Sequence, residues 1–139
     1  MKKAVRQAIF DKYEGRCAYC GCELTKGWHV DELELIRRKN KFVGGYQDNN
    51  GEWVERRLVP DGCMHPERLN SDNQMPACAS CNINKHSMSL EEFRSLIQGF
   101  MKHLNERNTQ YKIAKRYGLV KEFIEPVVFY FETLQNTNQ

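Results

Sequence analysis

The stretch "MPACASCNINKHS", residues 75–87, contains one of two closely spaced cysteine pairs. Cys78 and Cys81 form this pair, and Cys17 and Cys20 form the other in "CAYC". Two residues between paired cysteines allow both sulfurs to reach one ion, and two such pairs complete the closed tetrahedral shell of a structural zinc site. The four cysteines therefore predict a structural zinc that joins two distant parts of the chain.

Length and composition indicate one domain. The chain has 139 residues, a net charge of +3 and 40% hydrophobic residues, a size at which a metal cross-link usefully supplements a modest core. No apolar run approaches the roughly 18 residues of a membrane span, and the first residues lack the apolar region of a signal peptide. We therefore expect a cytoplasmic protein that does not enter a membrane.

The use of cysteine agrees with this expectation. Six cysteines in a chain without an export signal favour metal binding over disulfides. Cys22 and Cys63 lie outside the two pairs. Cys63 and His65 have the spacing of a further metal-binding pair, but unpaired cysteines are more often small buried apolar residues.

Helices are predicted in three places. Apolar residues recur at helical spacing over residues 2–14, and Ser89 with Glu92 forms a capping box before a helix over 89–104. A shorter helix is predicted to start after Asn108 and to end near Gly118.

Strands and irregular segments complete the α+β pattern. Residues 28–36 alternate in the manner of a strand with one buried face. Residues 40–73 are rich in Gly, Asn and Asp and are expected to be irregular, with a short strand or hairpin at 52–59. Residues 125–134 are β-branched and aromatic, which predicts a strand or an extended segment packed on the core.

The succession "CAYCG", "WHVDEL", "DNQMPACASCNINK" and "SLEEF" resembles the HNH endonucleases, specifically the small phage-encoded kind with a zinc-linked ββα-metal core. The family pattern is Cys-x-x-Cys, a strand with Asp-His, then Asn-x-x-Pro-x-Cys-x-x-Cys-Asn/His-x-x-Lys, and the match covers about residues 4–100. The resemblance implies one HNH-like domain over 1–139, with a core at about 16–104 and an extension over 105–139. Flanking helices at both ends and a C-terminal strand would surround that core.

The resemblance also implies roles for individual residues. Asp31 and Asn82 match the ligands of a catalytic divalent ion, Mg²⁺, Mn²⁺ or Ni²⁺. Asn73 matches the residue that keeps the catalytic strand and loop in register. Glu32 occupies the position of the general-base histidine, which is the clearest departure from the family pattern.

This departure changes the expected chemistry. Histidine has a pKa near 6.5 and exchanges protons near neutrality, whereas the reference pKa of glutamate is about 4.3. Loss of a general base typically costs roughly 10²–10⁴ in rate. His29 shares the strand face of Asp31 while Glu32 points to the other face, so His29 is a candidate assistant in catalysis. A lone histidine on a strand is more often structural.

Basic residues provide candidate DNA contacts. Arg37, Arg38, Lys39 and Lys41 follow the strand directly, and Lys85 and His86 follow the second cysteine pair. Lysine and arginine contacts to phosphates are independent of sequence and sensitive to salt. Such a charged run is more often simply a solvated face.

Three hypotheses follow. The first is an HNH-type metal-dependent DNA endonuclease that hydrolyses phosphodiesters and is attenuated by Glu32. The second is a catalytically inactive HNH-derived protein that binds DNA or inhibits a host defence protein in the host cytoplasm, which Glu32 and the non-proline residue Leu35 favour. The retention of Asp31, Asn73, Asn82 and Lys85 argues against complete decay and favours the first. A third is that Glu32 was introduced to silence a toxic nuclease.

Overall fold

The computed structural model describes residues 1–136 and has a mixed α and β architecture, which confirms the predicted fold class at this level. The helices are α1 (Lys3–Asp11), α2 (Ala79–Lys85), α3 (Leu90–Arg107), α4 (Thr109–Arg116) and α5 (Tyr130–Asn136), with a 3-10 turn η1 (Pro66–Arg68). The strands are β1 (His29–Glu32), β2 (Arg38–Val43), β3 (Tyr46–Gln47), β4 (Trp53–Val54), β5 (Arg57–Cys63) and β6 (Gln74–Ala77). They form three antiparallel two-stranded sheets, β1–β6, β2–β5 and β3–β4.

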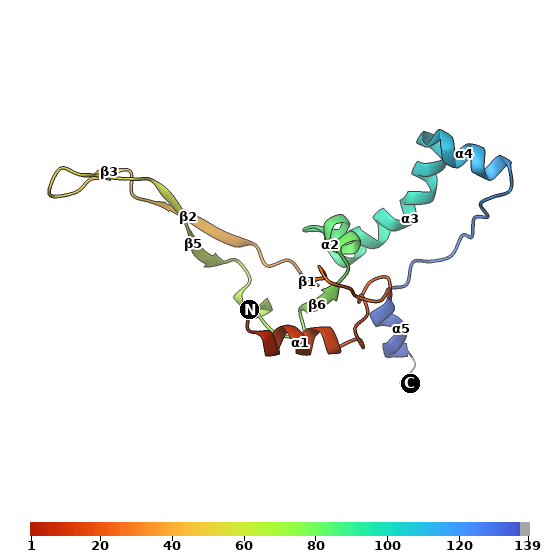
Figure 1. Ribbon diagram of the computed structural model, residues 1–139, viewed down its shortest axis with the longest axis horizontal. Helices are drawn as coiled ribbons and strands as arrows, with labels where there is room; N and C mark the ends of the chain where they lie inside the picture. The colour runs from red at the N-terminus through yellow and green to blue at the C-terminus, as the bar shows by residue number, and fades with distance from the viewer. Residues whose placement is uncertain (137–139) are drawn as a thin grey trace.

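The centre of the molecule is the β1–β6 sheet with α2 directly after it (Figure 1). Asp31 of β1 lies opposite Met75 of β6, and His29 lies opposite Ala77. The amide of Ala18 donates to the carbonyl of Pro76 at 2.8 Å, which attaches the first cysteine pair to β6. This unit therefore gathers both cysteine pairs and the strand that carries Asp31.

An aromatic cluster forms the core beside this unit. The rings of Tyr19, Phe93 and Phe129 are each 5.6 Å apart between centroids, and Phe131 stacks on Phe129 at 6.0 Å. Arg94 of α3 donates to the carbonyl of Val127 at 2.6 Å. The C-terminal segment is thereby packed against α3 and the first cysteine pair.

The predicted helices are confirmed. Residues 3–11 form α1, and the capping box at α3 is present, because the Ser89 hydroxyl accepts from the Glu92 amide and the Ser89 amide donates to the Glu92 carboxylate at 2.7 Å. α4 ends at Arg116, before Gly118 with its φ of +72°.

The predicted C-terminal strand is wrong. Residues 125–129 have no regular secondary structure; Phe129 is buried in the core and Val127 packs against it, and α5 begins at Tyr130. The Glu132 carboxylate accepts from the Phe129 amide at 2.8 Å and so provides a local cap for the first turn of α5. The buried aromatic residues Phe129 and Phe131 therefore enter the core from an irregular segment and a helix.

The first strand and the central segment also differ from expectation. β1 covers only residues 29–32, because the chain turns at Leu33 and Glu34 to meet Asn73. Residues 38–63 are mostly a regular two-stranded ribbon that projects from the centre (Figure 1). Gly44 and Gly45 have φ of +83° and +77°, and a Cβ on Gly44 would lie 2.2 Å from the Glu55 carbonyl oxygen. Glycine is therefore required where the ribbon bends.

Among residues 1–136, no helix is both long and apolar enough to cross a membrane.

The packing of the C-terminal segment is testable by substitution. Phe129 is 1% exposed, whereas Phe123 in the same segment is 76% exposed. We expect Phe129→Ala to lower the free energy of unfolding by about 3–5 kcal/mol because it leaves a cavity among aromatic rings. Phe123→Ala, the control, is expected to change it by less than about 0.5 kcal/mol. Urea unfolding measures both, and equal stabilities would contradict this packing.

Candidate metal centre and the residues around it

The two cysteine pairs meet in space. The sulfurs of Cys17, Cys20, Cys78 and Cys81 all lie within 4.8 Å of one another, and those of Cys20 and Cys78 are 3.8 Å apart. A tetrahedral zinc with Zn–S bonds of about 2.3 Å has sulfur–sulfur edges of about 3.8 Å. The cluster is therefore compatible with a structural metal such as zinc, as the sequence predicted.

Local backbone geometry orients the sulfurs. In the first pair, the Gly21 amide donates to the Cys17 carbonyl at 2.9 Å, which closes a tight turn. In the second, Cys78 is the N-cap of α2, and its sulfur accepts from the Cys81 amide at 3.4 Å. A hydrogen bond from the Cys81 side chain lowers the pKa of the Cys17 thiol to about 4. The cluster therefore already favours one of the thiolates that metal binding requires.

The remaining cysteines do not build a second centre of this kind. Within residues 1–136, no other group of three or more His, Cys, Asp or Glu side chains converges. Cys63 ends β5, and His65 makes its contact with Glu67 at 3.2 Å.

Beside the cluster, Asp31 lies in a buried ion pair. Asp31 is 7% exposed and Lys85 1% exposed, and the Lys85 Nζ lies 3.0 Å from Asp31 Oδ2. The Tyr19 hydroxyl donates to the same oxygen, and the Lys85 Nζ also donates to the Glu32 carbonyl at 2.7 Å. Burial, and then the nearby charge of Asp31, raise the pKa of Tyr19, so its hydroxyl remains a donor. These contacts join α2 to β1.

This arrangement corrects the role predicted for Lys85. A side chain that is 1% exposed and bonded to Asp31 and to the Glu32 carbonyl does not contact DNA phosphates. Its function is to balance a buried carboxylate. Tyr19 was not predicted as a site residue, although its position inside "CAYC" places it next to whatever the cysteines enclose.

Asp31 retains one oxygen for a ligand. Its contacts with Tyr19 and Lys85 are both made at Oδ2, and the described residues include no buried side-chain oxygen without a partner. Oδ1 accepts no hydrogen bond from those residues and is not fully buried. Asn82 is half-buried and lies three residues before Lys85, on the same face of α2. A carboxylate and an amide oxygen are donors that suit a hard divalent ion.

Glu32 is held by its own chain. Its side chain is 21% exposed, Oε1 accepts from Arg38 at 2.5 Å, and Oε2 accepts from the Ile36 amide at 3.1 Å. Arg38, predicted to contact DNA, is thus an ion-pair partner of the residue at the general-base position. The carboxylate stabilises the turn between β1 and β2.

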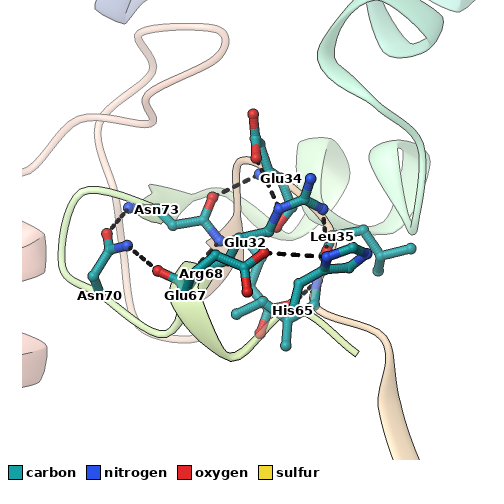
Figure 2. A network of polar contacts seen from close by, with 9 residues as sticks. Glu32, Glu34, Leu35, His65, Glu67, Arg68, Asn70 and Asn73 are labelled. Carbon is teal, nitrogen blue, oxygen red and sulfur yellow. Dashed lines mark hydrogen bonds and ion pairs between the residues drawn. The ribbon is translucent and has the colours of Figure 1, made fainter. Parts of the chain in front are cut away.

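Asn73 connects the segment after β1 to the loop before β6 (Figure 2). Its side-chain amide donates to the carbonyls of Glu34 and Arg68 at 2.9 and 3.1 Å, and its Oδ1 accepts from the Glu34 amide at 2.7 Å. Arg68 adds a bond to the Leu35 carbonyl at 2.9 Å and an ion pair with Glu34. The predicted positioning role of Asn73 corresponds to these contacts.

The other predicted residues lie at the surface. His29 is exposed at the start of β1, and His86 is exposed at the end of α2, with φ of +48° and its Nδ1 2.8 Å from the Ser87 hydroxyl. Arg37 and Lys39 are exposed, and Lys41 pairs with Asp61 at 2.8 Å.

Comparisons with protein-family models, curated proteins and solved structures found no match to this chain.

Metal content tests the cysteine cluster. We expect one zinc per chain, and Cys78→Ser should remove it and destabilise the fold, because three thiolates with one hydroxyl no longer complete the shell. Cys63→Ser is the matched control, since Cys63 lies outside the cluster, and it should retain the metal. Elemental analysis of the purified proteins measures this. A well-folded wild type without metal would refute the assignment.

The buried ion pair predicts a second stability effect. Lys85→Met should lower the free energy of unfolding by about 3–5 kcal/mol, because it leaves the Asp31 charge buried without its partner. Lys112→Met, at an exposed position of α4, serves as the control. Adding Asp31→Asn to Lys85→Met should restore part of the loss, and a double-mutant cycle without coupling would contradict the pairing.

Proposed function

We propose that this protein is an HNH-type, metal-dependent DNA endonuclease with a zinc-linked ββα-metal core, attenuated by Glu32. The single observation that carries the proposal is the junction of β1 with α2, where Asp31 meets Lys85 and Asn82 occupies the same face of the helix. The order β1, β6, α2, with the cysteine cluster beside it, is the arrangement the family pattern implies.

The donors present fit a divalent ion. Asp31 Oδ1 and the Asn82 amide would hold it, and such an ion polarises the scissile phosphate and stabilises the leaving oxygen. Lys85 lies 3.0 Å from the other oxygen of Asp31 and already offsets its charge. We therefore expect the ion to bind weakly.

We expect proton transfer from the attacking water to limit the rate of the proposed reaction. The Glu32 carboxylate accepts from Arg38 and from the Ile36 amide, so both of its oxygens are engaged in the fold and neither is free to bind the attacking water. His29 is exposed on the same strand and is the other side chain to which we assign a part in positioning the attacking water. Loss of an efficient base corresponds to a rate lower by roughly 10²–10⁴.

The engagement of both carboxylates also favours a second candidate, an HNH-derived protein that binds DNA or a host protein without cleavage. Asp31 and Glu32 each have a cationic partner in the fold, Lys85 and Arg38. In this case the two acids contribute stability rather than chemistry.

Plasmid nicking distinguishes the candidates. The wild type, Glu32→His, Asn82→Ala and Glu34→His are incubated with supercoiled DNA and Mg²⁺, Mn²⁺ or Ni²⁺, after zinc content confirms each fold. We expect the wild type to nick plasmid slowly. The nicking rate of Glu32→His should be at least about tenfold higher, because a general base is restored. Asn82→Ala should lose nicking activity. Glu34→His, two residues from the site, is the control and should match the wild type.

Each outcome decides between the candidates. An inert wild type with an active Glu32→His would establish the non-cleaving candidate on an HNH scaffold. Inactivity of both proteins with all three ions would refute the nuclease proposal.

A further inference from the structure

The ribbon of residues 38–63, here called the ribbon arm, exposes large apolar side chains to solvent. Phe42 is 60% exposed, Tyr46 57%, Trp53 66% and Leu58 56%. A two-stranded ribbon alone is marginally stable in water, and aromatic residues contribute most when they are covered. The ribbon arm therefore has the character of a binding surface.

Aromatic and guanidinium side chains occur at two places along the ribbon arm. Phe42 and Leu58 are cross-strand partners and point to the same face. The guanidinium of Arg56 lies over the Phe42 ring at 3.9 Å from its centroid. Trp53 pairs with Gln47 farther along the ribbon arm, towards its tip. Aromatic rings and guanidinium planes are the groups on which nucleic-acid bases stack.

The charge of the ribbon arm indicates the kind of partner that it binds. The part of the ribbon arm nearest the core, with Arg37, has six basic and only two acidic side chains: Arg37, Arg38, Lys39, Lys41, Arg56 and Arg57 against Glu55 and Asp61. Arg38 pairs with Glu32 and Lys41 with Asp61, and a positive excess remains. A polyanion is the complement of this surface. The tip instead carries Asp48 and Glu52, and the Asp48 carboxylate accepts from the Asn50 and Glu52 amides. An acidic tip opposes insertion between the phosphate rows of a duplex groove.

We propose that the ribbon arm binds unpaired bases of DNA. Bases stack on the Phe42–Arg56 pair and on Trp53, while the basic side chains near the core follow the phosphate backbone. The substrate is accordingly single-stranded DNA, or duplex DNA with locally unpaired bases, delivered to the β1–α2 junction. This inference rests on the DNA-directed function proposed above and names its substrate class.

Oligonucleotide binding tests the inference separately from cleavage. Fluorescence anisotropy compares a single strand, its perfect duplex and a duplex with a central unpaired bubble. No divalent ion is added, so hydrolysis does not contribute, and no chelator is used, so the structural metal stays bound. The variants are Phe42→Ala, Trp53→Ala and the conservative Phe42→Tyr, and the control is Phe123→Ala, an aromatic residue 76% exposed outside the ribbon arm.

We expect the wild type to prefer the single strand and the bubble to the perfect duplex. Phe42→Ala and Trp53→Ala should each weaken binding to these two ligands about 5- to 150-fold, the equivalent of about 1–3 kcal/mol per stacked base. The dependence on salt should not change, because no charge is removed. Phe42→Tyr should retain affinity, and Phe123→Ala should behave as the wild type.

Equal affinity for all three ligands, or wild-type binding by both alanine variants, would overturn the inference. Failure of the nuclease proposal has a different signature. If the protein never nicks plasmid but prefers unpaired DNA, the nuclease proposal fails and the binding inference stands. If it nicks plasmid without that preference, the binding inference fails and the nuclease proposal stands.

Discussion

The convergence of four cysteine sulfurs is the constraint on which the rest of this structure depends. It connects segments that are 58 residues apart in the chain and places the turn of the first pair against β6 and the N-terminus of α2. A metal in this cluster would offset the entropy of closing so long a loop. Every other feature of the centre follows from this closure, because Tyr19 lies inside the first pair and Lys85 lies one turn after the second.

Beside the cysteine cluster, the contacts that stabilise Asp31 and Glu32 compete with the catalytic roles proposed for them. Burying Asp31 is costly unless its charge is paired, and Lys85 with Tyr19 provides that pairing at Oδ2. Because of these contacts, only the second oxygen of Asp31, Oδ1, is left to bind a divalent ion. Glu32 is in a similar position, since its carboxylate stabilises the turn after β1 through Arg38 and the Ile36 amide. The two acids for which we propose nuclease roles therefore also contribute to folding, and this is the basis of the weak activity that we propose.

What the sequence could predict was set by local rules. Cysteine spacing identified the cluster, and the Ser89–Glu92 pattern identified the start of α3. These features depend on side chains a few residues apart, so they can be recognised without tertiary information.

The failures concern tertiary context. Lys85 was predicted to contact DNA, but it is buried and forms an ion pair with Asp31, because a buried carboxylate needs a cationic partner. Residues 40–73 were expected to be mostly irregular because of their Gly and Asn content. In the structure, the glycines lie at the bend of the ribbon arm and Asn50 lies at its tip. The aromatic residues near the C-terminus have strand propensity, but contacts with α3 and the cap from Glu132 decide their conformation.

X-ray absorption at the zinc edge tests the central claim most directly, because it reports the atoms around the metal in the intact protein. A closed four-cysteine centre predicts a single shell of four sulfur neighbours at about 2.3 Å. A shell containing nitrogen or oxygen, or fewer than four sulfurs, would contradict the closed four-cysteine centre on which this description of the fold is built.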